Sequence, residues 1–554
     1  MLRLGACVLG LVLLTGIQAT AGVNPRNGNF YISYTDLIPD TPGFDITRTY
    51  NSRATHTLSF GHGWGWPLDT ALQVNADGSV SVTENGSGMV RQYFPVGQTA
   101  AAIADQVADL VGVMETQGWL SSDSARDAAR AELMSDADLR RSLQAQMVRE
   151  NLIDRPDIAV GTRLVSRQEP GVEILRETAG FYRLRPGGFD RFDTEGRLME
   201  VGHAQATSYR LTRNWQGHLR AIILPDGATI AIRTNAGGQI IAAEHDGKTA
   251  TYVYDDRARL IRAVNVDGGA FDYEYDDAGL MTRIGYQNGT SLRNFYEPET
   301  GFTSRQEFPD GRVQDYSYFS NTPEDPQHTE EYGTETRYFG SRHDTRPHTI
   351  ERMVFQMAND ALGNAFTART LRTVNGVTTE TRYHPCGQPT LRRQGSQLAE
   401  FDYDADCRVT LRRSGGQEMR YSYDPRSGKI TSVTEIDLAS GRQSSSSYDY
   451  DLRGQLVRAR NSAGESVTLE YDAAQRINRI ERETGDVLLF TYNDANKPLT
   501  IEIPGVGTLD ITYDAAGEIA RVDSPDGHLA ALQITQTFQT LLSLVQAAEI
   551  SFGL

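Results

Sequence analysis

The sequence predicts a mostly β fold, a long antiparallel β-sheet built from consecutive hairpins, with a small helical insertion and a C-terminal helix. The 554 residues include 52 glycines and 25 tyrosines, so residues that favour turns and residues that favour strands are both abundant. Pairs of tyrosine and aspartate recur at nearly constant spacing, each followed by a turn and usually by a leucine or isoleucine. Such a period predicts a repeat architecture, which can grow long without dividing into separate domains.

The first 21 residues have the features of a signal peptide. Arg3 gives a short basic start, residues 4–17 form an apolar run too short to span a bilayer comfortably, and Ala19-Thr20-Ala21 offers the small residues that a signal peptidase needs. We expect cleavage after Ala21. Because no later segment resembles a membrane span, we expect a soluble protein that is secreted, periplasmic or associated with the cell surface.

The charge balance argues against nucleic acid as a partner. Lys and Arg number 54 against 72 Asp and Glu, a formal net charge of −18. A phosphate backbone would on average be repelled by such a chain.

The Tyr–Asp repeat fills most of the chain. Tyr450, Tyr471, Tyr492 and Tyr513 follow one another at steps of 21 residues. The residues that define the repeat are Tyr254, Asp255, Tyr275, Asp276, Tyr403, Asp404, Tyr423, Asp424, Tyr450, Asp451, Tyr471, Asp472, Tyr492, Tyr513 and Asp514. Weaker copies at Phe192, Trp215, Tyr296, Tyr318 and Tyr383 continue the series toward the N-terminus and fill its gaps.

One repeat explains the length of the period. Tyr275 ends a strand, Asp276-Asp277-Ala278-Gly279 makes a turn, and the next strand alternates from Leu280. Asp can accept hydrogen bonds from its own turn, and Gly tolerates the positive φ that closes it. A second turn follows at Asn288-Gly289, a pair typical of hairpins. Each repeat is therefore two strands and two turns, and because a lone two-stranded ribbon is marginal in water, the repeats must stack edge to edge.

These repeats resemble those of the RHS/YD-repeat family, which includes bacterial toxin shells and the teneurin-type YD shell. The N-terminal region resembles the domain that commonly precedes such repeats, through Gly28-Asn29-Phe30, Asp36-Leu37, the run from Phe44 to Ser52, and the run from Phe60 to Trp66. The resemblance implies a spiralling β-sheet that forms a shell around a hollow interior. The residue patterns and the resemblance together predict this organisation: signal peptide 1–21, N-terminal RHS-associated β domain 22–98, helical insertion 99–154, YD-repeat β-shell 155–527 and C-terminal amphipathic tail 528–554.

Two departures from the family bear on function. Toxin-bearing members carry a paired Asp-Pro-x-Gly motif after the repeats, which releases a C-terminal effector by self-cleavage, and this sequence lacks the pair. Only 27 residues, His528 to Leu554, follow the last turn, too few for a nuclease or deaminase fold. We therefore expect a shell without cargo of its own.

The Ala-rich segment 99–152 predicts two or three short helices. Its residues Ile103, Val107, Leu110, Val111 and Met114 share one helical face. Ser135, three residues before Asp138, resembles a capping box at the start of a later helix. Because strands lie on both sides, we interpret the segment as an insertion, either a structural plug or a partner-binding module.

The C-terminal tail also has helical periodicity. Ile534, Phe538, Leu541, Leu542 and Val545 fall on one stripe of a helix. This pattern favours a helix that packs on or inside the sheet and caps its last edge. The alternative is a docking helix for a partner or a membrane, although the tail from Leu529 onward has no Lys or Arg to engage anionic lipid.

The cysteines give a testable local prediction. Cys7 would leave with the signal peptide, and Cys386 and Cys407 occupy nearly equivalent turns of consecutive repeats. Neighbouring turns lie close enough to be bridged, and a secreted protein permits the bond. We predict a disulfide between them that contributes roughly 2–4 kcal/mol. The alternative is two buried free thiols.

The remaining candidates for chemistry have simpler structural explanations. His62, Trp64 and Trp66 could form a sugar or metal site, but their alternation with glycine favours a tightly packed β corner. His384 beside Cys386 lacks an orienting acid and would be blocked by the disulfide. The turn aspartates lack the spacing of a calcium loop. The sequence therefore predicts no catalytic, cofactor-binding or metal-binding residue and no cofactor.

Between Asn321 and Asn375 the repeat phase fades. We expect the sheet to widen or change register there. Pro323, Pro326 and the acidic Glu330-Glu331 suggest an exposed insertion.

Together these features predict a non-enzymatic, secreted shell protein that acts as a scaffold, container or surface-interaction module. Its partner would be an unknown protein or glycan. Two alternatives are a delivery shell for a separately encoded toxin and a carbohydrate-binding adhesin that uses exposed Tyr and Trp side chains.

Overall fold

The computed structural model describes residues 20–545, apart from 40–43, 85–87, 98, 155, 167, 168, 170, 204–207, 426, 452, 494–496 and 514–518. Most of the expected signal peptide, including Cys7, and the repeat residue Asp514 lie outside the described residues. The chain divides into two compact units, Met1–Gln388 and Pro389–Leu554, here called the first and second units. Each is described separately.

The predicted fold class is confirmed, because both units consist mainly of antiparallel strands paired in sequence order. Within a unit, the row of consecutively paired strands is called its ladder. The side of the ladder that carries the repeat tyrosines and most buried side chains is called the inner face.

A small sheet begins the first unit. It has the order β1-β2-β3-β6, and the short strands β4 and β5 form a separate pair. The bounds are β1 Thr20–Val23, β2 Phe30–Leu37, β3 Ile46–Asn51, β4 Thr57–Leu58, β5 Gly61–His62 and β6 Trp64–Gly65, followed by the 3-10 turn η1 Pro67–Asp69. Since β1 begins at Thr20, the expected cleavage after Ala21 would fall within this strand. Strands β2 and β3 alternate buried and half-buried residues, as side chains on opposite faces of a strand must.

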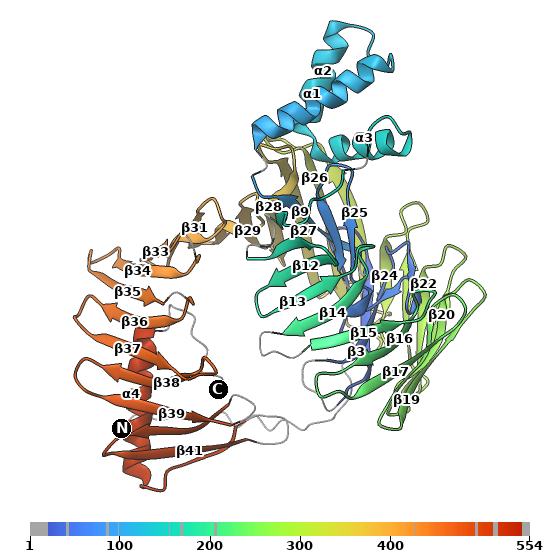
Figure 1. Cartoon of the computed structure of the whole chain (residues 1–554). Helices are drawn as coiled ribbons and strands as arrows, with labels where there is room; N and C mark the ends of the chain where they lie inside the picture. The colour runs from blue at the N-terminus through green and yellow to red at the C-terminus, as the bar shows by residue number, and fades with distance from the viewer. Residues whose placement is uncertain are drawn as a thin grey trace. The chain divides into compact units, whose positions relative to one another are not determined.

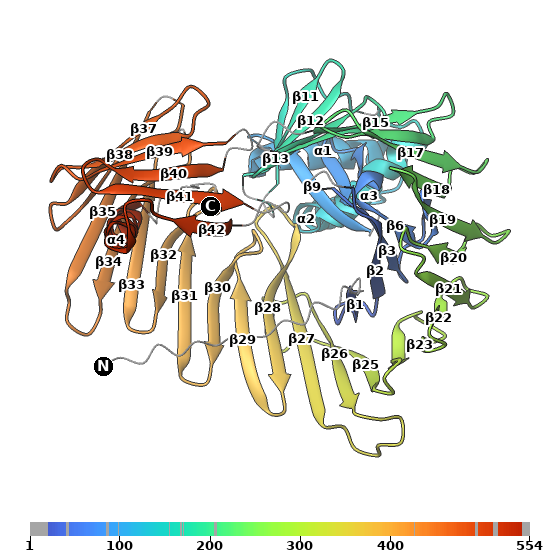
Figure 2. The same cartoon turned by 90° about the horizontal axis from the view of Figure 1, so that it is seen from below.

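The ladder of the first unit curves around this small sheet (Figure 2). Its strands are β7 Ala71–Val74, β8 Val80–Glu84, β9 Met89–Pro95, β10 Arg163–Val165, β11 Glu173–Glu177, β12 Gly180–Arg185, β13 Gly188–Phe192, β14 Leu198–His203, β15 Ser208–Arg213, β16 Leu219–Ile223, β17 Thr229–Thr234, β18 Ile240–His245, β19 Lys248–Tyr254, β20 Leu260–Val264, β21 Ala270–Tyr275, β22 Met281–Tyr286, β23 Ser291–Tyr296, β24 Thr303–Glu307, β25 Val313–Asn321, β26 Glu330–Phe339, β27 Thr349–Asn359, β28 Ala365–Val374 and β29 Val377–Tyr383.

The predicted N-terminal domain of residues 22–98 is divided between two sheets. Strands β7–β9 belong to the ladder rather than to the small sheet, because β9 pairs with β10, with Phe94 opposite Val165. The helical insertion separates β9 from β10 in sequence, but the two strands are adjacent in space. The sequence did not indicate this pairing, because the repeat pattern begins only later in the chain.

The sheet widens where the repeat phase fades, as expected. Strands β25 to β28 have 9, 10, 11 and 10 residues, whereas the strands that precede them in the ladder have at most 7. Glu330 and Glu331 belong to β26 and pair with β27, so the suggestion that they lie in an insertion was wrong. The exposed connection is confined to residues 322–329.

Three helices form the predicted insertion: α1 Ala100–Thr116, α2 Asp123–Ser135 and α3 Ala137–Arg149. Helices α1 and α2 extend away from the strands of their unit (Figure 1). The predicted capping box at Ser135 was wrong, since Ser135 ends α2 and Asp136 caps α3 by accepting a hydrogen bond from Leu139 N. The insertion is anchored to the turn between β27 and β28, where Leu362 joins its apolar core and Gly363 O accepts from Ala137 N.

The second unit contains the remaining repeats and the C-terminal helix α4 His528–Val545. Its strands are β30 Pro389–Gln394, β31 Gln397–Tyr403, β32 Val409–Ser414, β33 Gln417–Tyr423, β34 Ile430–Asp437, β35 Gln443–Tyr450, β36 Leu456–Asn461, β37 Ser466–Tyr471, β38 Ile477–Arg482, β39 Val487–Tyr492, β40 Pro498–Ile503, β41 Gly507–Tyr513 and β42 Ile519–Asp523. As predicted, each 21-residue period from Tyr450 onward holds two strands and two turns.

Helix α4 lies against the inner face of the second unit's ladder (Figure 2). It contacts β36, β37, β40 and β41, so it covers a face of the sheet rather than only its last edge. Ile534, Leu541 and Val545 are buried, and Phe538 approaches the Phe490 ring at 6.1 Å between centroids. The side chain of Leu542 lies outside the described residues. Among the helices that the structure describes, none combines the length and apolar character needed to span a bilayer.

Candidate functional site

The repeat tyrosines join neighbouring repeats through one recurring hydrogen bond. The Tyr471 hydroxyl donates to the backbone oxygen of Leu456 at 2.8 Å, and Leu456 is the first residue of the strand that follows the preceding Tyr–Asp pair. Each tyrosine therefore binds the corner of the repeat before it. The same bond, at 2.7 or 2.8 Å, is made by Tyr254, Tyr275, Tyr296, Tyr318, Tyr403, Tyr423, Tyr450, Tyr492 and Tyr513.

A β-bulge accompanies these tyrosines. In the pairing of β37 with β38, the register shifts between Glu470 and Tyr471, so that Tyr471 lies opposite Ile477. A bulge increases the local twist and redirects a side chain. Here the bulge lies at the tyrosine whose side chain points toward the preceding corner.

The aspartate that follows each tyrosine organises the turn. Asp472 Oδ1 accepts from the backbone N–H groups of Ala474 and Arg476, both at 2.9 Å, and Oδ2 accepts from the Arg476 guanidinium at 2.7 Å. Asp255 and Asp404 bind the arginines four residues later in the same way. Asp276, Asp424 and Asp451 accept from turn N–H groups without an arginine at that position.

The electrostatics of these aspartates follow from their contacts. Partial burial of Asp472 raises its pKa, but the hydrogen bonds and charge of Arg476 outweigh burial and hold the pKa below its ordinary value. Asp404 behaves in the same way with Arg408. Burial raises the pKa of Tyr471 to about 12, so this hydroxyl stays protonated and remains a donor.

The cation of one turn also contacts the tyrosine of the next repeat, a feature that the sequence reasoning missed. The Arg476 guanidinium lies 4.8 Å from the centre of the Tyr492 ring, and Lys497 lies 5.0 Å from that of Tyr513. The same contact joins Arg259 to Tyr275 at 5.3 Å and Arg408 to Tyr423 at 4.8 Å. The sequence signal was available as a basic residue four positions after the aspartate or asparagine.

A buried ion pair fastens the small sheet to the ladder of the first unit. Arg48 on β3 and Asp36 on β2 are both fully buried, with Arg48 Nε 2.6 Å from Asp36 Oδ2. Tyr273 and Tyr252 of the ladder complete the site, because Arg48 donates to the Tyr273 hydroxyl at 2.8 Å and the Tyr252 hydroxyl donates to Asp36 at 3.0 Å. The Trp64 ring lies 4.5 Å from the guanidinium. Burial lowers the pKa of Arg48, but the Asp36 carboxylate more than offsets it, so the guanidinium remains charged.

The glycine-alternating segment around His62 is packed as the sequence suggested. Trp64 and Trp66 are buried, and Trp64 Nε1 donates to the hydroxyl of the repeat residue Tyr275 at 3.0 Å. His62 N donates to Ala258 O at 2.9 Å, and partial burial lowers the pKa of the His62 ring. These residues join the small sheet to repeat corners.

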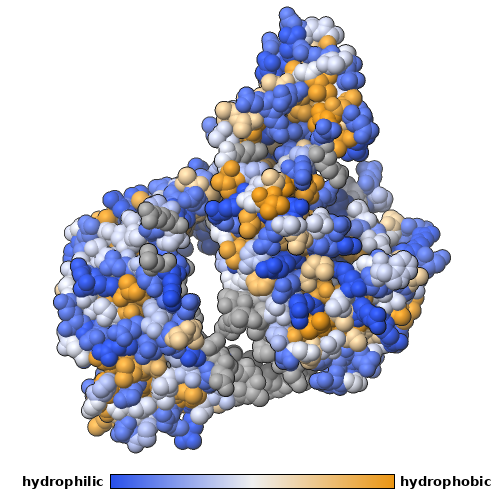
Figure 3. Space-filling model, viewed as in Figure 1, coloured by the Kyte–Doolittle hydropathy of each residue, from blue (hydrophilic) through white to orange (hydrophobic). Residues whose placement is uncertain are grey.

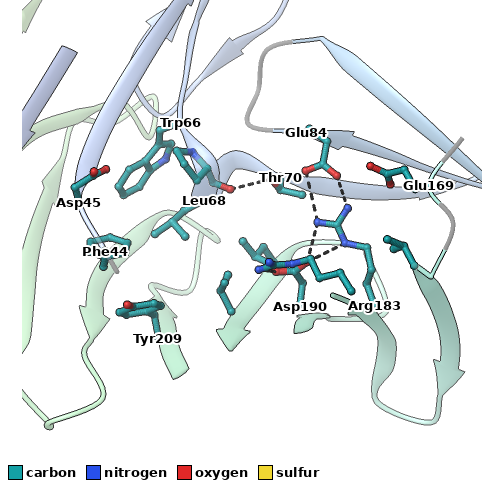
Figure 4. Close-up of a pocket in the computed structure, with 15 residues that line it drawn as sticks. Phe44, Asp45, Trp66, Leu68, Thr70, Glu84, Glu169, Arg183, Asp190 and Tyr209 are labelled. Carbon is teal, nitrogen blue, oxygen red and sulfur yellow. Dashed lines mark hydrogen bonds and ion pairs between the residues drawn. The ribbon is translucent and has the colours of Figure 1, made fainter. Parts of the chain in front are cut away.

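A cavity of about 400 Å³ lies between the small sheet and the ladder of the first unit (Figure 4). One wall is apolar and includes Phe44, Trp66, Leu68 and Tyr209. The other wall is charged, and Arg183 there contacts both Glu84 and Asp190. Asp190 also binds Arg185 at 3.0 Å. Because these charges already neutralise one another, we interpret this wall as structural: its ion pairs join β8, β12 and β13.

The two predicted disulfide cysteines are both in turns. Cys386 is buried, and its sulfur lies 3.0 Å from His384 Nδ1. Cys407 has a φ of 61°, and its N–H donates to Asp404 O at 3.0 Å to close the turn. The structure contains no disulfide between them. Their pairing stays a prediction.

The fold and these contacts define a class: a tandem-repeat β protein whose hairpins are joined by Tyr–Asp corners and preceded by a small covering sheet. Family comparisons agree with this class. Residues 444–551 match the family described as Teneurin YD-shell, and residues 20–92 match a domain of unknown function, DUF6531. The resemblance to the RHS/YD-repeat family, with the domain that precedes its repeats, is thereby confirmed. No curated protein matches the sequence.

Several solved structures match this chain at low sequence identity and low TM-score. A crystal structure of TcdB2-TccC3-TEV is 13% identical with a TM-score of 0.39, over 90% of this chain and 27% of that one. For TcdB2-TccC3 without its hypervariable C-terminal region the values are 14%, 0.35, 91% and 28%. For the Photorhabdus luminescens Tc holotoxin pore they are 13%, 0.33, 89% and 29%. The chain thus spans less than a third of the length of these proteins.

Proposed function

We propose that this chain is a secreted, non-enzymatic YD-repeat protein whose sheets enclose polypeptide, so that it serves as a container or scaffold. One observation carries the proposal: in each unit, the inner face of the ladder is covered by another segment of the same chain. The small sheet covers it in the first unit and α4 covers it in the second. The ladders are thus suited to surround polypeptide on that face.

The non-enzymatic part of the proposal is supported by the structural contacts that the charged side chains already make. In the cavity of Figure 4, Arg183, Arg185, Glu84 and Asp190 bind one another. The aspartates of the repeat corners are likewise committed to turn N–H groups. Secretion rests on the signal-peptide features of residues 1–21.

Protease protection tests the container role. The full-length protein is purified from its native cells and incubated with protease, and fragments of any co-purified polypeptide are identified by mass spectrometry. A container should protect that polypeptide until the sheet is opened. We expect protection to fall in Leu488→Asp, which places a charge in the buried core of the second unit, and to persist in Trp215→Ala, which changes a side chain that is 91% exposed.

The result decides among the candidate roles. If the co-purified polypeptide is digested as fast as the free polypeptide, or if none accompanies the protein, the container role is wrong. A protected toxin from a separate reading frame would identify a delivery shell. Retention on a glycan array that is lost in Trp215→Ala would instead identify an adhesin.

A further inference from the structure

A second cavity of the first unit lies where the ladder is widest. It has a volume of about 430 Å³, within the usual range of small-molecule sites. Strands β27 and β28, the turn after β29, and two arginines from the N-terminal part of the chain line it. The lining residues that bear on ligand binding are Arg26, Arg91, Phe355, Phe366, Thr370 and Tyr383.

Arg26 is held in this cavity by neutral groups. Its guanidinium donates from Nε to the Tyr332 hydroxyl at 2.8 Å and from an Nη to the Thr367 hydroxyl at 2.8 Å, and it lies 3.3 Å from Met357 Sδ. It also lies 5.8 Å from the centre of the Phe355 ring. These contacts fix the orientation of the side chain without neutralising its charge.

The charge of Arg26 has no acidic partner among the described residues, since no carboxylate lies within ion-pair distance of it. This contrasts with most of the ladder, where arginines such as Arg259 and Arg476 bind the aspartates of their own turns. Arg91, the other cation of the cavity, binds Glu169 at 3.1 Å, but Glu169 does not line this cavity. In a chain with a net charge of −18, a cavity with two arginines and no lining carboxylate is a local exception.

The other lining groups indicate the character of the part of a ligand that would lie beside an anionic group bound to Arg26. Phe355 and Met357 are buried, and Phe366 and Tyr383 are half-buried, so they offer an apolar wall beside the cation. The Thr370 and Tyr383 hydroxyls lie 3.2 Å apart and can hydrogen-bond a ligand oxygen. Because Nε and one Nη of Arg26 donate to the cavity wall, its other Nη is the group that can donate to a carboxylate oxygen.

We propose that this cavity binds an organic carboxylate with an apolar body, with Arg26 as the residue that contacts the carboxylate. The carboxylate can belong to a free small acid or to an acidic side chain of a polypeptide. The inference does not depend on the container role, because it rests only on the groups that line the cavity.

Calorimetric titration of the full-length protein with phenylacetate tests the proposal. Phenylacetamide has nearly the same shape without the charge, and we expect it to bind at least about tenfold more weakly. Binding of phenylacetate should weaken with added salt, as an interaction with a charge requires. Acetyl-Leu-Glu-Phe-amide and its Gln counterpart form a second pair of probes. Tighter binding of the Glu peptide than of phenylacetate would show that the carboxylate belongs to a polypeptide side chain. Tighter binding of phenylacetate would show that it belongs to a free acid.

The matched variants are Arg26→Gln and Arg53→Gln. Arg53 is also an exposed arginine of the N-terminal region that stacks on an aromatic ring, Phe302 at 4.9 Å, and donates to a neutral oxygen, but it does not line the cavity. We expect affinity to fall roughly ten- to a hundredfold in Arg26→Gln, from the loss of a charged hydrogen bond. Arg53→Gln should bind as the unchanged protein does.

Thermal unfolding of each variant shows whether it is folded. If Arg26→Gln does not fold, Arg26→Lys keeps the charge but loses the planar fork, and its affinity should lie between those of the unchanged protein and the amide control. Three results would each overturn the proposal. These are equal affinity for phenylacetate and phenylacetamide, undiminished binding in Arg26→Gln, and no binding of any probe at concentrations up to about 10 mM, near the weakest affinity expected of such a site.

Discussion

Replacing Arg48 by methionine should destabilise the first unit strongly. The change removes the guanidinium from a site where it binds Asp36, donates to Tyr273 and lies against Trp64. The Asp36 carboxylate would remain fully buried, with the Tyr252 hydroxyl as its remaining side-chain donor among the described residues. Breaking a buried ion pair by removing one partner typically costs about 3–5 kcal/mol. We expect a loss of that size in the free energy of unfolding.

The tryptophans provide a selective assay. All four, Trp64, Trp66, Trp119 and Trp215, belong to the first unit, so urea unfolding followed by tryptophan fluorescence reports on that unit alone. The exposed Arg53→Met variant is the control, and we expect it to lose less than about 1 kcal/mol.

A double variant separates the buried charge from the lost packing. Asp36→Leu combined with Arg48→Met removes both charges, so it should recover more than half of the loss. The Tyr252 and Tyr273 hydroxyls would account for the remaining deficit, since both lose a partner. A single variant Arg48→Met as stable as the unchanged protein, or a double variant less stable than Arg48→Met, would refute the reasoning.

Four further predictions concern the repeats and the second unit. Tyr471→Phe removes the bond to the preceding corner and should cost about 1 kcal/mol, measured as faster hydrogen exchange of the adjacent amides; unchanged exchange would contradict it. Because the folded-state pKa of Asp472 is depressed, its contribution to stability is present above its unfolded pKa, near 4, and is lost as pH falls through the folded value. Asp472→Asn should therefore destabilise the second unit at pH 7, and this deficit should shrink as the pH falls below about 4, as urea unfolding at a series of pH values would show; a deficit independent of pH would contradict it. Thiol titration of the unfolded, unreduced, secreted protein should find neither Cys386 nor Cys407 reactive, and two reactive thiols would exclude the disulfide. Leu541→Ala in α4, at a side chain only 1% exposed, should cost about 2–5 kcal/mol, seen by circular dichroism, while the tryptophan signal of the first unit keeps its midpoint.

The sequence predicts the repeat well because its signals are local. A Tyr–Asp pair, the turn after it and the alternation that follows all fall within one period, so Tyr471 and Asp472 can be placed without knowledge of the rest of the chain. The helix α4 is predictable for the same reason, since its apolar stripe from Ile534 to Val545 is a local pattern.

Contacts between distant segments were not predictable in this way. Arg48 and Tyr273 are 225 residues apart, and neither carries a local sign that they meet. The pairing of β9 with β10 across the helical insertion is hidden for the same reason. The partners of Arg26, Tyr332 and Thr367, lie more than 300 residues away, so the cavity that it enters becomes visible only in three dimensions.

The bond from each tyrosine to the corner before it has a consequence for how such a chain can change length. Excising or duplicating a segment of one complete period leaves every remaining hydroxyl opposite a backbone oxygen and every strand with its apolar side facing the same way. An insertion of a single residue within a strand would reverse that orientation for the residues after it. Genetic variation should therefore alter this architecture in whole modules, with small insertions tolerated at the turns.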